Sequence, residues 1–127
     1  MCTYCTKTPG LHSFSYLNKD EDNAAVFYSC PGKACYTEFD DGLVKLTAHI
    51  QTSLENVESW VWVFDGANFG LRNALHVRTA LALCKMFNAD PRLKRIVIIN
   101  PTWHIHSTML FLYPIMSKDM RDKIKMQ

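Results

Sequence analysis

The sequence has no apolar run long enough to cross a membrane. Its longest largely apolar stretch, Met109 to Met116, has eight residues, whereas a membrane-spanning helix needs about 20. The first ten residues hold no apolar run of the kind found in secretory signal peptides. We therefore expect a cytoplasmic protein that meets membranes only peripherally, with residues 1–10 as a loose leader and residues 11–127 as one domain.

Net charge is also low. The chain has 14 Lys and Arg against 12 Asp and Glu, a formal net charge of +2, which gives no reason to expect a nucleic-acid partner. Basic residues gather only near the C-terminus, where an anionic membrane could attract each by about 1 kcal/mol. The alternative for these residues is an ordinary solvated helix end. They are Lys118, Arg121, Lys123 and Lys125.

Common cofactor and nucleotide signatures are missing. The segment from Gly66 to Gly70 lacks both the Lys-Ser/Thr of a phosphate loop and the spacing of a dinucleotide fingerprint. The five cysteines are an odd number, and without a secretory signal we expect reduced thiols. The pairs Cys2-x-x-Cys5 and Cys30-x₄-Cys35 resemble half-sites for zinc or a redox pair, and the sequence leaves their role open.

The chain does contain alternating strand-like and helix-like segments. Trp60 to Phe64 and Ile96 to Ile99 are apolar on both faces, a pattern typical of parallel strands covered on both sides. Further strands are expected at Ala24 to Cys30 and from Lys123 to Met126. The sequence therefore predicts an α/β fold with a layered, mostly parallel sheet flanked by helices.

Two helices are predicted before the second core strand. Between residues 40 and 57, apolar residues recur every three or four positions, which predicts an amphipathic helix with Asp40 or Asp41 as N-cap. A second helix is expected to begin at Asn73 and to carry Cys84 on its apolar face.

The last helical segments have an unusual composition. A helix is expected from about His104 to Pro114. The stretch from Thr108 to Met116 is apolar nearly all round, so it needs a partner on every side, whether protein, bound lipid or membrane. Pro114 ends or kinks this helix, and Ser117 is expected to cap a short one that follows. The short helix could swing as a unit.

Three ordered segments carry a resemblance to one family. Val61 to Asp65, with Gly66 and Phe69-Gly70-Leu71, is similar to a strand-Asp-Gly-Phe segment. Lys94 to Pro101 is similar to a second core strand ending in Asn and Pro. Tyr113 to Met116, followed by Lys123-Ile124, is similar to the region around a mobile gate helix. Together, from about Leu11 to the C-terminus, they resemble the CRAL-TRIO lipid-binding domains, which include phosphatidylinositol and phosphatidylcholine transfer proteins.

The resemblance implies an apolar pocket with strands as its floor and a C-terminal helical gate. Its implied function is to bind, and to transfer between membranes, a phospholipid, fatty acid, sterol or retinoid. No catalysis and no cofactor other than the bound lipid are expected. The residues expected to contact the ligand are Trp60, Trp62, Phe64, Ile96, Ile98, Ile105, Met109, Leu112 and Lys123.

The sequence departs from the family pattern in ways that bear on the ligand. Lys123 matches the Lys of phosphatidylinositol binders, but Pro91 stands where they carry a Glu. Trp60 and Trp62 stand where phosphatidylcholine binders place small hydroxyl residues, which makes a sterol, retinoid, fatty acid or single-chain lipid more plausible. We recognise neither the helical module nor the closing segment that flank this domain in the family, so we expect a minimal version of it, or one whose pocket is completed by a protein partner or a second copy.

Two other functions remain open. Pro101-Thr102-Trp103 resembles a segment of a sister group of the family that binds small GTPases and their regulators, which would make the chain a protein-interaction module. His104-x-His106 and Asp65, at a strand's carboxyl end, could instead form a metal-dependent hydrolase site.

Overall fold

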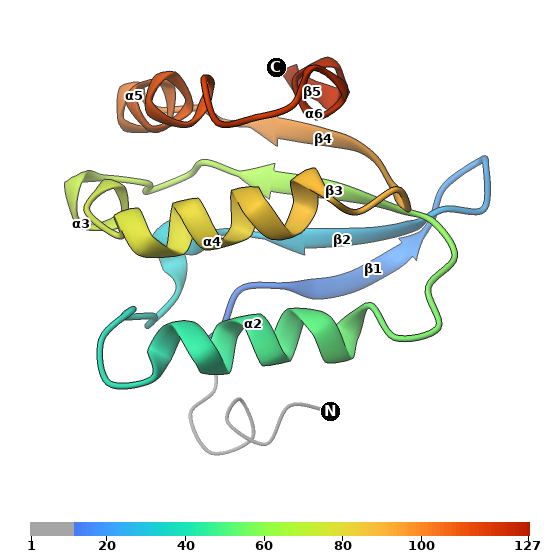
Figure 1. The fold of residues 1–127 in the computed structure, drawn as a ribbon, viewed down its shortest axis with the longest axis horizontal. Helices are drawn as coiled ribbons and strands as arrows, with labels where there is room; N and C mark the ends of the chain where they lie inside the picture. The colour runs from blue at the N-terminus through green and yellow to red at the C-terminus, as the bar shows by residue number, and fades with distance from the viewer. Residues whose placement is uncertain (1–11) are drawn as a thin grey trace.

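The computed structural model describes residues 12–127, which form a five-stranded sheet with helices (Figure 1). The strands lie side by side in chain order, with β1 antiparallel to β2 and every later pair parallel. The predicted α/β class with a mostly parallel sheet is confirmed. The strands are β1 (Ser15–Lys19), β2 (Ala25–Ser29), β3 (Trp60–Asp65), β4 (Leu93–Ile99) and β5 (Ile124–Met126).

Strand β1 was not predicted from the sequence. All five of its residues are exposed, so it lacks the apolar alternation that marks a half-buried strand. The turn that follows holds it beside β2, because the Asp20 carboxylate accepts hydrogen bonds from the backbone N–H groups of Asp22 and Ala24, both at 2.9 Å.

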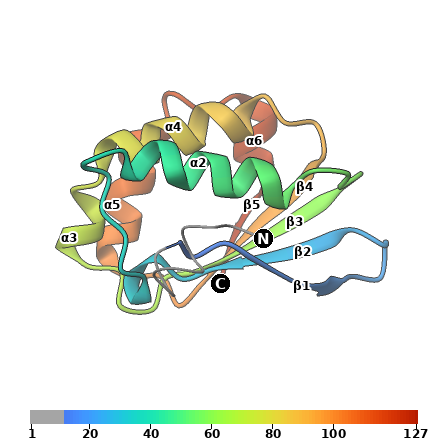
Figure 2. The same cartoon turned by 90° about the horizontal axis from the view of Figure 1, so that it is seen from below.

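The helices pack on one face of the sheet (Figure 2). The apolar runs of the core strands predicted cover on both faces, but the described helices cover only one. The outer face instead carries β-branched residues such as Val26, Val63 and Val97, which favour strands even when half exposed. The helical segments are η1 (Pro31–Lys33), α2 (Gly42–Ser53), α3 (Leu71–Ala74), α4 (Val77–Asn88), α5 (Trp103–Leu112) and α6 (Lys118–Lys123).

The helix expected to begin at Asn73 is two helices, α3 and α4. Asn73 lies inside α3, where its side chain accepts from Gly70 N–H at 3.0 Å and donates to the Pro31 carbonyl at 3.1 Å. It therefore ties α3 to η1, and His76 is the N-cap of α4. Asp41 is the N-cap of α2 but makes no side-chain cap.

The cap predicted at the last helix is confirmed. The Ser117 hydroxyl accepts a hydrogen bond from Met120 N–H at 3.1 Å, and α6 then runs directly into β5.

The core lies between the inner face of the sheet and the helices. Trp60 is fully buried, with its ring 5.8 Å from Phe27 and 5.2 Å from Phe87 between ring centroids. Its indole N–H donates to the Asp90 carboxylate at 3.2 Å. This aromatic cluster fills the end of the sheet where β3 begins and leaves a space at the carboxyl ends of the strands.

Candidate ligand pocket

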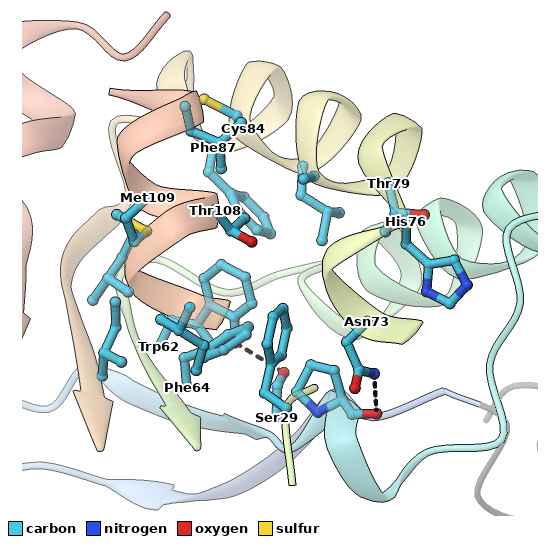
Figure 3. A pocket seen from close by; sticks show the side chains of 18 of the residues that line it. Ser29, Trp62, Phe64, Asn73, His76, Thr79, Cys84, Phe87, Thr108 and Met109 are labelled. Carbon is cyan, nitrogen blue, oxygen red and sulfur yellow. Dashed lines mark hydrogen bonds between the residues drawn. The ribbon is translucent and has the colours of Figure 1, made fainter. Parts of the chain in front are cut away.

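A cavity of about 180 Å³ lies between the inner face of the sheet and helices α4 and α5 (Figure 3). Among residues 12–127, its lining includes no Lys, Arg, Asp or Glu. Most of its wall is aliphatic or aromatic, which suits a ligand site whose main driving force is the burial of apolar surface.

The structure brings together seven of the residues expected to contact a ligand. Strands β3 and β4 supply the floor, and α5 supplies one wall because Ile105, Met109 and Leu112 recur on one side of the helix. The seven lining residues are Trp62, Phe64, Ile96, Ile98, Ile105, Met109 and Leu112.

Trp60 and Lys123 do not line this cavity. Trp60 lies in the aromatic core beside it. Lys123, at the end of α6, forms an ion pair with Asp119 at 3.0 Å, and its side chain is 16% exposed. In this conformation its ammonium group is therefore held on its own helix, away from the cavity wall.

Helix α4 and the segment before it contribute lining residues that the sequence analysis did not assign to the site. Leu83 and Phe87 lie on the inner side of α4, and Phe69 precedes α3. The helical spacing of the apolar residues in α4 marks its buried side. Nothing in the spacing distinguishes a core position from a pocket wall.

Most polar side chains in the lining already have protein partners. Tyr36 and Thr79 share a hydrogen bond of 2.6 Å between their hydroxyls, and Thr79 also donates to Glu38 at 3.0 Å. Burial raises the pKa of the Tyr36 hydroxyl. The Thr108 hydroxyl donates to the His104 carbonyl within α5 at 2.9 Å. These groups add little free hydrogen-bonding capacity to the cavity.

Ser29 and Trp62 form a polar pair on the cavity floor. The Trp62 indole N–H donates to the Ser29 hydroxyl oxygen at 2.9 Å, and both side chains are buried (Figure 3). Neighbouring positions in β2 and β3 place them together, because Phe27 pairs with Trp62 and Ser29 with Phe64. The residues in this pair come from parallel strands that are distant in sequence.

Asp65 forms a separate cluster. Its carboxylate accepts from the Tyr28 hydroxyl at 2.5 Å, Ala67 N–H at 2.9 Å and the Asn100 amide at 3.1 Å. These hydrogen bonds, with Tyr28 the largest contribution, lower the pKa of Asp65. Asp65 is therefore a structural acceptor that fastens the ends of β2, β3 and β4 together.

The residues of the hydrolase hypothesis do not assemble into a metal site. His104 and His106 lie on α5, so their side chains point about 200° apart around the helix axis at about 100° per residue. The His104 ring stacks on Trp103, with 3.8 Å between centroids. Within residues 12–127, no three His, Cys, Asp or Glu side chains are grouped to hold a metal.

The cysteines in the described part of the chain are free. Cys30 and Cys84 are buried and Cys35 is exposed, and burial raises the pKa of the Cys84 thiol. Cys2, Cys5 and the expected leader lie outside the described residues. No helix found between residues 12 and 127 has both the length and the apolar character needed to span a bilayer.

Comparison with known families agrees with this architecture. The model of the CRAL/TRIO domain matches residues 11–127, nearly the whole chain. A comparison with curated proteins gives no match. The chain therefore belongs to the CRAL/TRIO domain family.

Proposed function

We propose that this protein binds a hydrophobic ligand in the cavity between the sheet and helices α4 and α5, and carries it between membranes. The CRAL/TRIO domain family binds small lipophilic ligands. The observation that carries the proposal is that Trp60 and Trp62 leave an apolar cavity instead of filling it. The activity is binding, not catalysis.

The cavity volume bears on the size of the ligand. A dry apolar cavity of about 150 Å³ holds a benzene molecule, whereas pockets for drug-sized ligands measure about 300–1,000 Å³. At about 180 Å³, this cavity suits a compact ligand. A phospholipid, sterol or long-chain fatty acid would require the surrounding helices to move outward.

Helix α5 is the element best placed to move. Its inner residues Ile105 and Leu112 are buried against the cavity, and the segment through Pro114 to Ser117 separates it from α6. A ligand that is costly to expose to water needs such a gate. We propose that α5 and α6 form the gate.

The outer side of α5 supports contact with a membrane. Trp103, Leu110 and Phe111 are 69%, 76% and 50% exposed. Apolar side chains exposed in this way can enter the headgroup region of a bilayer, and Lys118, at the start of α6, can meet anionic lipids. We propose that the gate opens where this surface touches the membrane.

Native mass spectrometry of gently purified protein tests the binding proposal. We expect a mass above that of the apoprotein, and release of the extra mass after extraction with organic solvent. A clean apoprotein mass under conditions in which known lipid carriers keep their ligands would contradict the proposal. Transfer is measured separately, as movement of a fluorescent lipid from donor to acceptor vesicles.

Protein interaction is the second candidate function. Trp103, in the segment Pro101-Thr102-Trp103, is 69% exposed, and an exposed Trp is typical of residues that dominate binding at protein interfaces. Affinity capture with small GTPases and their regulators, compared with lipid extraction, separates the two functions. A ligand-free protein that captures these partners and loses them on Trp103→Ser would favour protein interaction.

A further inference from the structure

The inner face of the three central strands carries one hydroxyl group. In β2 the inward residues are Ala25, Phe27 and Ser29, and the inward residues of β3 and β4 are apolar. Ser29 is 2% exposed and lies in the cavity lining (Figure 3). A polar group at this depth needs hydrogen-bond partners.

The hydrogen bonding of Ser29 is half complete. Its oxygen accepts from the Trp62 indole N–H at 2.9 Å, but within the described residues no acceptor takes its own proton. A serine hydroxyl offers one donor, and leaving a buried donor unmatched is costly. The bond from Trp62 also polarises the hydroxyl and makes it a better donor.

The missing partner is an acceptor that brings no charge. A carboxylate would need a neighbouring cation, and the lining formed by the described residues holds no Lys or Arg. A ligand hydroxyl would introduce another proton to satisfy, where Thr79 and Thr108 already have partners. A carbonyl oxygen only accepts, and so completes the arrangement without a new requirement.

We propose that the ligand is a compact apolar ketone, aldehyde or ester whose carbonyl oxygen accepts a hydrogen bond from Ser29. This inference rests on the binding function proposed above and narrows its ligand class. The cavity volume of about 180 Å³ sets the compact size. Ser13 and His76 are other polar candidates in the described lining, but both are only half buried. The Ser13 hydroxyl accepts from Cys30 N–H at 2.6 Å, and His76 lies at the turn between α3 and α4.

Two probes of nearly equal shape isolate the hydrogen bond. Acetophenone carries a carbonyl oxygen where cumene (isopropylbenzene) carries a methyl group. We expect Ser29→Ala to lower the preference for acetophenone over cumene by about fivefold to tenfold, the value of one hydrogen bond. Dissociation constants come from NMR titration of the Trp62 indole N–H signal.

Three variants serve as controls. Ser29→Thr keeps the hydroxyl and should retain the preference. Thr108→Ala removes a lining hydroxyl whose proton is used within α5, and should leave the preference unchanged. His76→Leu should also leave it unchanged, and loss of the preference in this variant with retention in Ser29→Ala would overturn the proposal.

A spectroscopic measurement does not depend on the stability of the variants. The carbonyl stretching band of acetophenone bound to the wild-type protein should lie at lower wavenumber than in an alkane, because the Ser29 hydroxyl donates to it. A band at the alkane position would overturn the proposal even if Ser29→Ala failed to fold.

Hexadecanoic acid separates failure of this inference from failure of the proposed function. If hexadecanoic acid binds and acetophenone and cumene do not, the ligand class is wrong and the binding function stands. If none of the three probes binds, both proposals fail. An unchanged preference in folded Ser29→Ala overturns the role of Ser29 alone.

Discussion

Tyr28 and Asp65, in adjacent parallel strands, are joined by a hydrogen bond of 2.5 Å from the phenol to the carboxylate. The same bond lowers the pKa of Asp65 and, as its largest cause, raises the pKa of Tyr28. The bond stabilises the form in which Asp65 is ionised and Tyr28 is protonated. It fixes the carboxyl ends of β2 and β3, two of the strands whose inner faces form the floor of the cavity.

Tyr28→Phe should lower the free energy of unfolding by about 1.5–3 kcal/mol at pH 7, because it removes a hydrogen bond to a buried charge. The Asp65 pKa in the folded protein lies below its ordinary value of 3.8. The stability that Asp65 contributes is therefore complete above pH 3.8 and is lost as the pH falls toward the folded pKa.

Urea denaturation of both proteins at pH 7, 5 and 3 measures this effect. The difference between wild type and Tyr28→Phe should be constant from pH 7 to 5 and smaller at pH 3. Tyr16→Phe, on the exposed strand β1, is the control and should change stability little. A difference that grows toward pH 3 would contradict the assignment.

His12 should make the free energy of unfolding depend on pH at higher values than Asp65 does, between about pH 4 and pH 6.5. It is 8% exposed, and burial, with the charges of His49 and Lys45, lowers its pKa from 6.5 to about 4. As the pH falls from 6.5 to about 4, His12 is therefore protonated in the unfolded chain but still neutral in the folded protein. The free energy of unfolding falls with the pH over this range. The loss from pH 6.5 to 4 should be about 3 kcal/mol at most.

His12→Gln should flatten this part of the stability profile, as measured by urea denaturation at half-unit pH steps. The exposed His106 provides a matched substitution, and His106→Gln should leave the slope as in the wild-type protein. If both variants keep the full slope, another group is responsible for it.

Arg92 joins the loop after α2 to the start of β4. Its guanidinium makes two hydrogen bonds of 3.0 Å to Asp90 and donates to the Leu54 carbonyl at 2.9 Å. Burial alone would raise the pKa of Asp90, but the hydrogen bonds from Arg92 and Trp60, together with the charge of Arg92, outweigh it and the pKa is lowered. Lysine cannot reproduce this planar, forked geometry.

Arg92→Lys should therefore lower the free energy of unfolding by about 1–2 kcal/mol. The matched control is Arg95→Lys, whose ion pair with Asp20 at 3.2 Å is exposed and should contribute less than about 1 kcal/mol. Chemical denaturation at pH 7 measures both. Equal effects of the two substitutions would show that the forked contacts of Arg92 are unimportant.

Membrane contact should depend on the outer side of α5. Leu110→Asp together with Phe111→Ser should reduce cosedimentation with vesicles of phosphatidylcholine and phosphatidylserine by about tenfold or more, because each substitution removes apolar area from the contact. Val44→Asp, at a position on α2 that is 67% exposed, is the control.

The double variant should keep its ligand affinity, because Leu110 and Phe111 do not line the cavity. Unchanged vesicle binding by the double variant, or an equal loss on Val44→Asp, would rule out α5 as the membrane-contacting element.

The amino-acid sequence was sufficient to predict the helices and strands with strong local signals. The apolar runs of β3 and β4 and the Ser117 cap of α6 are confirmed because each depends on neighbouring residues. The exposed strand β1 was missed because its polar residues pair with β2 through contacts distant in sequence. The break between α3 and α4 was missed because Asn73 bonds to Pro31, 42 residues away.

The sequence by itself determined the composition of the site: apolar strands, an apolar helix α5 and the order of motifs typical of the family. Only the tertiary structure decided which of these residues surround a cavity. Trp60 and Trp62 share a strand face and cannot be told apart by alternation, yet the first is packed against Phe87 beside Asp90 and the second lines the cavity. The bond between Trp62 and Ser29 depends on strand register, which brings together residues 33 positions apart.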